Sequence, residues 1–134
     1  LACTNMIDAQ IRSRLRVQFD TTLPRFDLMA QLERVPNGLK MGELSKRMMV
    51  TGGNVTGITD QLVSEGLVVR EDNPGDRRAY IVKLTPDGRK QFKKMADAHE
   101  KWILELFAGL KDADKQGLYL TLADLKKHLS SIQR

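Results

Sequence analysis

Two arginines beside a predicted turn are the residues of this sequence best suited to chemistry, and the chemistry they suit is phosphate binding. Arg77 and Arg78 follow Asp76 at the end of the stretch 73–76, Asn-Pro-Gly-Asp, whose residues favour a tight turn. Because β-rich runs within residues 67–84 flank that turn, a hairpin is predicted there. Paired arginines on a narrow, stiff arm suit the minor groove of DNA, where the negative potential is deep.

A predicted helix before this hairpin has one side made of small and polar residues. Val55, Ile58 and Leu62 recur at helical spacing and define its apolar side. Thr51 is the predicted N-cap of this helix, and Gly66 is its predicted end. The opposite side has no long aliphatic residue, so it can enter a groove of DNA. The predicted DNA contacts on and before this helix are Thr51, Gly53, Asn54, Thr56 and Gly57.

Lys46 and Arg47 add a third basic feature, on a short helix predicted over residues 43–49. Leu44 and Met48 point inward in this prediction, which leaves the two cations facing outward as contacts for phosphates. Ordinary surface charge is the alternative explanation for each of them. The order of short helix, glycine-containing turn, second helix and basic hairpin is that of a winged helix-turn-helix.

At these residues the sequence resembles the MarR family of bacterial transcriptional regulators, and the resemblance extends over nearly the whole chain. The segments that carry it are Thr22-Leu23-Pro24-Arg25-Phe26, Val55-Thr56-x-x-x-Asp60-x-Leu62, Gly66-Leu67-Val68, and Asp76-Arg77-Arg78 followed by Leu84-Thr85-x-x-Gly88. The last is the most specific, because it is similar to the wing signature of the family. One departure is Gly57, which stands where many members carry a basic residue. The resemblance implies a DNA-binding regulator that forms a triangular dimer.

The charge of the chain favours a polyanionic partner. The 134 residues have a formal net charge of +5, and residues 33–94 hold 12 Lys or Arg against 8 Asp or Glu. No apolar run approaches the roughly 20 residues needed to span a bilayer, and there is no signal-peptide pattern. The single cysteine, Cys3, fits a reducing cytosol, so a cytoplasmic location is expected. Because the sequence begins inside a helix-compatible pattern, we expect further residues before Leu1.

The helices predicted on either side of the winged helix carry more apolar residues than a domain of this size needs. One covers residues 3–19, and two others run from Thr85-Pro86 to about Ala108 and onward from Asp112. A two-fold dimer of these terminal helices would bury the surplus. It would also repeat the recognition helix about 34 Å away, which predicts a pseudo-palindromic operator.

The predicted fold is therefore mainly α with a small β-hairpin wing (α+β), a winged helix-turn-helix with N- and C-terminal dimerisation helices. Its predicted divisions are an N-terminal helix of the dimerisation region (1–22), a winged helix-turn-helix DNA-binding domain (23–86) and C-terminal dimerisation helices (87–134).

A ligand-responsive regulator also needs an effector site, and the resemblance places it where the dimerisation helices meet the winged domain. In MarR-like proteins the effector is commonly an aromatic acid, and in some members its coenzyme A thioester. Arg16 and Arg25 are the candidates for binding a carboxylate or phosphate, with Phe26 and Met29 as an apolar wall. Plain core packing is the alternative for both apolar residues.

Two other functions compete with this prediction. Some family members sense oxidants through a cysteine near the first helix, but Cys3 lies later than in that subgroup, and Leu23 and Phe26 replace the accompanying tyrosines. A winged helix that binds protein would show no salt-dependent affinity for DNA. No enzyme, cofactor or metal site is expected, because His99 and His128 occupy separate helices without a nucleophile motif or metal-ligand spacing. Both histidines are expected to be solvated helix residues.

Overall fold

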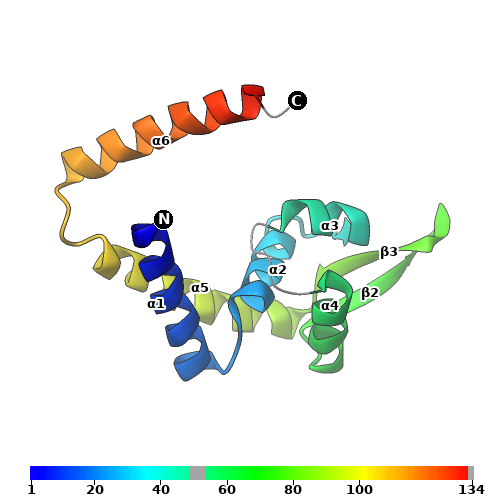
Figure 1. Cartoon of the computed structure of the whole chain (residues 1–134). Helices are drawn as coiled ribbons and strands as arrows, with labels where there is room; N and C mark the ends of the chain where they lie inside the picture. The colour runs from blue at the N-terminus through cyan, green and yellow to red at the C-terminus, as the bar shows by residue number, and fades with distance from the viewer. Residues whose placement is uncertain (49–53, 133–134) are drawn as a thin grey trace. The chain divides into compact units, whose positions relative to one another are not determined.

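The computed structural model describes residues 1–48 and 54–132, with the backbone alone for residues 76–79. The described elements are α1 (Ala2–Phe19), α2 (Leu23–Glu33), β1 (Leu39–Lys40), α3 (Met41–Arg47), α4 (Val55–Ser64), β2 (Val68–Asn73), β3 (Asp76–Leu84), α5 (Pro86–Leu106) and α6 (Asp112–Ile132) (Figure 1). The mainly α fold with a small β-hairpin wing is therefore confirmed. The chain packs as two compact units, Leu1–Glu100 and Lys101–Arg134. The predicted functional division 1–22, 23–86 and 87–134 stays a prediction.

Helix α2 begins at Leu23, because Thr22 and Pro24 favour a helix start there. The Thr22 hydroxyl accepts a hydrogen bond from the backbone N–H of Arg25 at 3.3 Å. Pro24 lies in the first turn, where its missing N–H costs no helical hydrogen bond. The helix ends before Gly38, which has a positive φ of 90°. A Cβ at Gly38 would lie 2.4 Å from Cγ2 of Ile81, so the chain enters β1 at a position that only glycine tolerates.

The short helix α3 begins and ends earlier than the predicted range 43–49. It starts at Met41 because the carboxylate of Glu43 accepts a hydrogen bond from the backbone N–H of Lys40, at 3.4 Å. Leu44 is fully buried, and Met48 is partly buried just after the helix. The inward direction predicted for Leu44 is therefore confirmed, while Met48 is buried only in part.

The predicted start of α4 is wrong. The helix begins at Val55 with Asn54 as its N-cap, whose Oδ1 accepts a hydrogen bond from the N–H of Thr56 at 3.0 Å. Thr51 and Gly53 lie outside the described residues. The predicted end is confirmed, since Gly66 follows the helix with a φ of 75° and donates its N–H to the carbonyl of Val63 at 3.0 Å.

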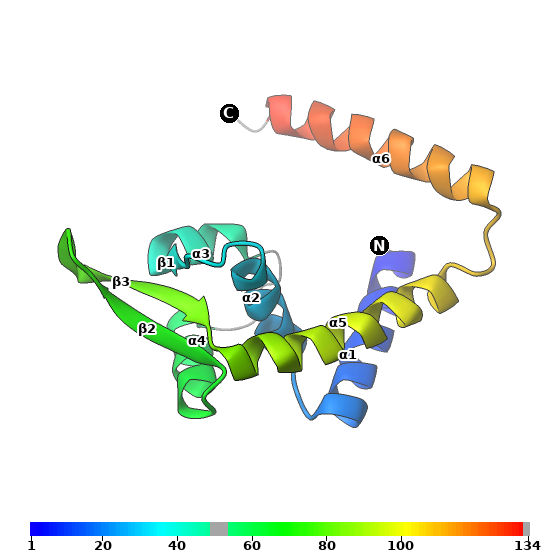
Figure 2. The ribbon, with the colours of Figure 1, turned by 180° about the vertical axis from the view of Figure 1, so that it is seen from behind.

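The sheet has three antiparallel strands in the order β1-β3-β2, and β1 was not predicted from the sequence. Leu39 pairs with Val82 across β1 and β3. The predicted hairpin of β2 and β3 is present, and it is longer than the two β-rich runs suggested, because pairing continues to Asn73 and Asp76 beside the turn. The hairpin extends beyond the helices, and α5 leaves from its base (Figure 2).

Helix α2 is the centre of the first unit, since it contacts α1, α3, α4 and β3. The fully buried side chains around it are Leu15, Leu28, Leu32, Leu44, Leu62 and Val82. Two polar side chains of α2, Asp27 and Gln31, are also buried, and Gln31 Nε2 donates to Asp27 Oδ1 at 3.1 Å. This bond lowers the cost of burying them.

Thr85 is the junction between the hairpin and α5. Its hydroxyl donates to the carbonyl of Gly66 at 2.6 Å and accepts from the N–H of Gly88 at 2.9 Å. Its own N–H donates to the carbonyl of Leu67 at 3.1 Å. The motif Leu84-Thr85-x-x-Gly88 is thus explained by structure, because it joins the end of α4, the base of the hairpin and the start of α5.

The last helix, α6, has no buried residue, and Asp112 is its first residue, where an N-cap was predicted. Leu118, Leu122, Leu125 and Leu129 follow helical spacing and are 44–52% exposed. No helix among the described residues is long and apolar enough to cross a membrane.

Gly88→Ala should strongly destabilise the fold, because a Cβ at this position would lie 1.9 Å from the carbonyl oxygen of Leu67. We expect a loss of about 2–4 kcal/mol in the free energy of unfolding, measured by urea denaturation at fixed protein concentration. Gly117→Ala is the matched control: a Cβ there would meet no atom within 4 Å, so this change should stabilise α6 by about 0.5–1 kcal/mol. Equal effects of the two changes would contradict the junction described for Thr85.

Candidate functional site

The outward side of α4 is polar and free of long aliphatic side chains, as predicted. Thr56, Asp60, Gln61 and Ser64 are exposed, and Gly57 is partly exposed. The opposite side packs inward through Ile58, Thr59 and Leu62. Such a helix can be held by one side while the other contacts a second molecule.

Asn54 and Thr59 have structural roles that the sequence analysis did not assign. Asn54 is exposed, but its side-chain oxygen is engaged in capping α4. Thr59 is fully buried, and its hydroxyl donates to the carbonyl of Val55 at 2.7 Å. Because that bond satisfies the hydroxyl within the helix, a polar residue can lie on the buried side.

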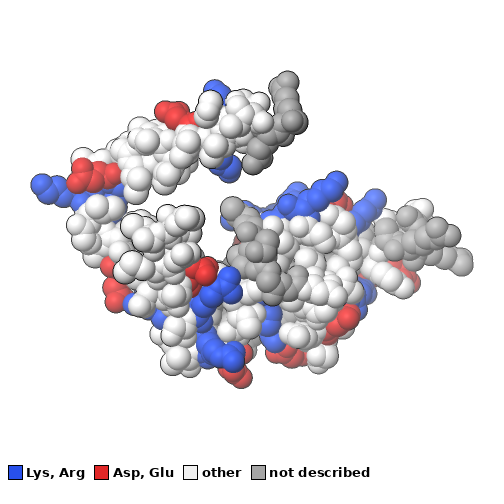
Figure 3. Space-filling view, viewed as in Figure 1, with Lys and Arg blue, Asp and Glu red and all other residues white. Residues whose placement is uncertain are grey.

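Lys46 and Arg47, at the end of α3, are exposed as predicted. Figure 3 shows Lys and Arg side chains gathered over α3. Because α3 comes directly before the segment that leads into α4, its cations can flank a ligand that contacts the outward side of α4. This arrangement suits a polyanion.

The hairpin provides the third predicted feature. Asn73 stabilises its turn, since Oδ1 accepts a hydrogen bond from the N–H of Gly75 at 3.2 Å. The backbone of Asp76, Arg77 and Arg78 forms the start of β3, beside the turn at the end of the arm. The side chains of these three residues lie outside the described part of the structure, so their contact with DNA stays a prediction.

Two ion pairs attach α4 to its neighbours, and neither was predicted. Nη2 of Arg25, at the start of α2, lies 2.7 Å from both carboxylate oxygens of Glu65, the C-cap of α4. Arg70 of β2 pairs with Asp60 of α4. Sequence reasoning had no signal for the first pair, because its members lie 40 residues apart.

A surface pocket of about 390 Å³ lies beside α4. Its lining residues are Arg12 of α1, Thr22, Pro24 and Arg25 around the start of α2, and Asn54, Gly57, Ile58 and Gln61 at and within α4. Arg12 also pairs with Asp8 of its own helix, at 2.7 Å. The Nε of Arg25 is buried and has no hydrogen-bond partner among the described residues. Two guanidinium groups therefore line the pocket, and each is paired with a carboxylate of the chain, Arg12 with Asp8 and Arg25 with Glu65.

The other predicted ligand residues are placed differently. Arg16 is exposed and does not line this pocket. Phe26 and Met29 are buried in the core, which was the alternative considered for both. The ring of Phe26 stacks on Phe92, with centroids 5.4 Å apart.

His99 is more enclosed than the solvated helix residue expected from the sequence. Its ring lies 5.1 Å from that of Phe26, centroid to centroid, and burial lowers the pKa of His99. His128 is exposed on α6. Among the described residues no group of His, Cys, Asp and Glu is arranged to hold a metal ion, and Cys3 is exposed near the start of α1.

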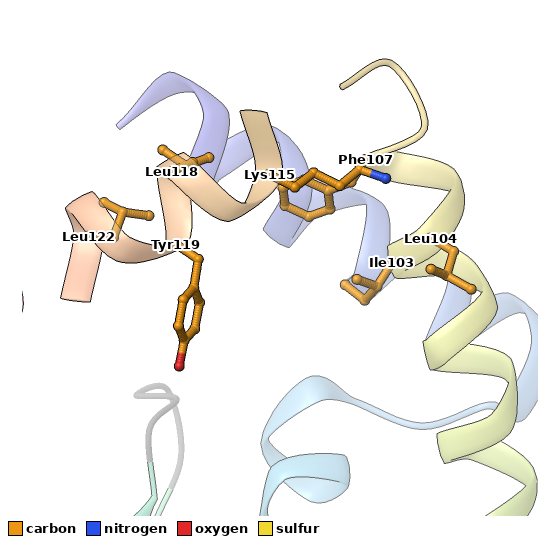
Figure 4. Close-up of a pocket in the computed structure, with 7 residues that line it drawn as sticks. All are labelled: Ile103, Leu104, Phe107, Lys115, Leu118, Tyr119 and Leu122. Atoms are coloured by element: carbon orange, nitrogen blue, oxygen red, sulfur yellow. The ribbon is translucent and has the colours of Figure 1, made fainter. Parts of the chain in front are cut away.

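The second unit has an apolar pocket of about 320 Å³ within it. Its lining residues are Ile103 and Leu104 of α5, Phe107 just after that helix, and Lys115, Leu118, Tyr119 and Leu122 of α6 (Figure 4). Because Leu104, Leu118, Tyr119 and Leu122 are 44–72% exposed, this pocket is part of an uncovered apolar surface.

Comparison with known proteins points to one family. A family model described as MarR family matches residues 19–79. The crystal structure of a MarR family transcriptional regulator from Silicibacter pomeroyi is 33% identical in sequence, with a TM-score of 0.78, over 96% of this chain and 86% of that one. A mutant MarR from E. coli complexed with operator DNA is 26% identical, with a TM-score of 0.79, over 92% of this chain and 88% of that one.

Among curated proteins, the HTH-type transcriptional repressor YetL of Bacillus subtilis is 29% identical over 103 residues, which are 77% of this chain and 62% of that protein. The chain spans less than two thirds of the length of several curated relatives that it matches.

Proposed function

The chain belongs to the MarR family of transcriptional regulators, and we propose that it binds an operator in double-stranded DNA as a homodimer, in the cytoplasm, and represses transcription until a small-molecule effector releases it. Like the other members of its family, the chain is a transcriptional regulator and not an enzyme. Repression is supported by the relative YetL, which is named a transcriptional repressor. It is also the simpler mechanism, since a protein needs only to occupy a promoter in order to block it.

The polar outward side of α4, which follows the basic helix α3 along the chain and precedes the hairpin, is the observation that carries this proposal. Its small and polar residues leave room for a groove edge, while α3 supplies exposed cations and the hairpin extends beyond the helices. The E. coli relative forms a complex with operator DNA. We propose that Asn54, Thr56 and Gly57 contact bases or nearby backbone, that Lys46 and Arg47 contact phosphates, and that Arg77 and Arg78 enter the minor groove beside Asp76.

A double variant, Lys46→Gln with Arg47→Gln, should weaken operator binding and reduce its salt dependence. The logarithm of the binding constant should fall less steeply with the logarithm of salt concentration, by about 0.9 for each phosphate that the variant no longer neutralises. Fluorescence anisotropy over a salt series, on an operator found by footprinting upstream of the protein's own gene, measures this slope. Lys93→Gln with Lys94→Gln removes the same charge from two adjacent exposed residues of α5 and should leave the slope unchanged.

A wild-type protein with no salt-dependent affinity for DNA would contradict the proposal. It would support instead a winged-helix module that binds protein. Binding that disappears with peroxide and returns with thiol would identify Cys3 as the trigger.

The homodimer is proposed because α6 leaves a row of leucines uncovered. In a two-fold dimer the same surface of both chains would cover this row, together with the apolar pocket of the second unit. Pairing two chains would also place two copies of α4 on one DNA duplex.

Leu118→Asp with Leu122→Asp should convert a dimer into a monomer, because two carboxylates would be buried without partners at the interface. Sedimentation velocity at micromolar concentration measures the change. Ala123→Asp is the control, since helical spacing places Ala123 on the opposite side of α6. A wild-type chain that sediments as a monomer would contradict the proposed dimer.

The effector is proposed to be an aromatic carboxylate or its coenzyme A thioester. The pocket beside α4 supports an anion, since Arg12 and Arg25 line it, while its position among Asn54, Gly57 and Gln61 would make ligand and operator exclude one another.

Arg12→Gln should raise, by about tenfold, the concentration of a benzoate-class acid that halves operator occupancy, because the guanidinium that holds its carboxylate is gone. Titration of the footprint with the acid measures this concentration. Arg16→Gln tests Arg16, which the sequence proposed as an effector contact together with Arg25. An unchanged titration in both variants would remove both residues from the effector site.

A further inference from the structure

The ion pair between Arg25 and Glu65 joins the start of α2 to the end of α4. A single Nη2 of Arg25 lies 2.7 Å from both oxygens of the Glu65 carboxylate. Glu65 is the C-cap of α4, and its own N–H bonds to the carbonyls of Gln61 and Val63. A force on the Glu65 side chain is therefore transmitted directly to the last turn of α4.

The basic member of this pair is shielded from water. The Arg25 side chain is 17% exposed, compared with 28% for Arg70 and 43% for Arg12 in their own pairs. An ion pair loses strength as water and salt reach it, so the arginine of this pair is screened less than the other two arginines, although the Glu65 side chain is 46% exposed. It is also a charge-assisted hydrogen bond, which has a preferred direction.

The direction of this hydrogen bond matters because the apolar packing that also holds α4 has little directional preference. The buried side chains Ile58 and Leu62 hold the helix against the body by apolar contact, which is non-directional and allows small sliding and rotation. The ion pair of Arg70 with Asp60 restrains one flank from β2, and Arg25 restrains the C-terminal end from α2. The two pairs therefore add directional restraints to the apolar packing of α4.

We propose that Arg25 is a positioning residue for DNA binding, which holds α4 through Glu65 and does not itself contact DNA. This inference rests on the proposed function, since it concerns how well α4 fits the operator. Arg25 lies in the first turn of α2 and lines the same pocket as Asn54 and Gly57, but its Nη2 is bound to Glu65 at the C-terminal end of α4. The proposed DNA contacts, Asn54 to Gly57, lie at the N-terminal end of α4. A small rotation about a released C-terminal end would displace those contacts from the groove.

Glu65→Gln gives the sharpest test, because a purely electrostatic effect and a loss of α4 positioning would change operator affinity in opposite directions. Removing a negative charge beside DNA should tighten binding by electrostatics alone. If Glu65 is needed to hold α4, the same change should weaken operator binding, by about three- to tenfold. Glu33→Gln removes the same charge from an exposed site at the far end of α2, and it should leave affinity unchanged or slightly raised.

Arg25→Gln separates positioning from direct contact. We expect the affinity to fall while the salt slope stays that of the wild type, because every phosphate contact of the wild type is kept. The exchanged pair, Arg25→Glu with Glu65→Arg, should restore affinity to within about twofold, because it remakes the link with the charges reversed.

Three outcomes would overturn the proposal: Glu65→Gln binding as tightly as wild type or more tightly, Arg25→Gln lowering the salt slope by about 0.9, or an exchanged pair no better than the single variants. Thermal unfolding of each variant confirms that it is folded at the temperature of the assay.

Amide hydrogen exchange tests the link without DNA. In Glu65→Gln, residues 59–65 should exchange faster than in wild type or Glu33→Gln, while residues 27–32 of α2 should not change. Equal exchange of residues 59–65 in all three proteins would overturn the inference. A wild-type protein that binds no operator would instead overturn the proposed function, and this exchange experiment would still decide whether the pair holds α4.

Discussion

The burial of one side of α4 is the interaction on which the rest of the structure depends. Leu62 is fully buried and Ile58 nearly so, and removing each such side chain from water stabilises the fold by about 1.5–3 kcal/mol. Thr59 shares this side at little cost, because its hydroxyl is bonded to the carbonyl of Val55. The apolar attachment of the helix is thereby confined to its buried side, and its outward side needs no apolar residue for stability.

The hydrogen bonds of Thr85 connect the end of α4 to the hairpin and to α5. Gly66 ends α4, Leu67 leads into β2, and both carbonyls accept hydrogen bonds from Thr85 at the start of α5. Helix α4, the hairpin and α5 are thus joined by hydrogen bonds between Thr85 and backbone carbonyls. These elements cannot move apart without breaking those bonds. A displacement of the first turn of α5 would therefore be transmitted to the base of the hairpin and the end of α4.

Local signals made most of the fold predictable. The Thr22 cap with Pro24, the Gly66 helix end and the turn at Pro74-Gly75 each depend on residues close in sequence, and each is present in the structure. The strand β1 could not be predicted, since two residues form a strand only by pairing with β3, about forty positions later.

The same limit explains what the sequence missed at the candidate site. The start of α4 was placed too early, because Thr51 and Asn54 are both residue types that cap helices, and Asn54 is the N-cap of α4. Arg25 was expected to bind the carboxylate or phosphate of an effector. In the structure it binds the carboxylate of Glu65, which the packing of α4 on α2 brings close to it. His99 was expected in solvent and instead lies against Phe26.

Gly57 indicates that electrostatic attraction to DNA and recognition of a base sequence would come from different parts of the proposed site. A Cβ at this position would meet nothing closer than Asn54 Cβ at 3.7 Å, so packing does not require glycine. Glycine within a helix costs about 1 kcal/mol relative to alanine, and it leaves out the cation that the resemblance to MarR proteins would place there. Because α4 has no basic residue, the proposed electrostatic attraction to DNA would come from other elements, Lys46 and Arg47 of α3 and the hairpin. The polar groups of α4 are then left to distinguish one base sequence from another, which depends on their orientation more than on their charge.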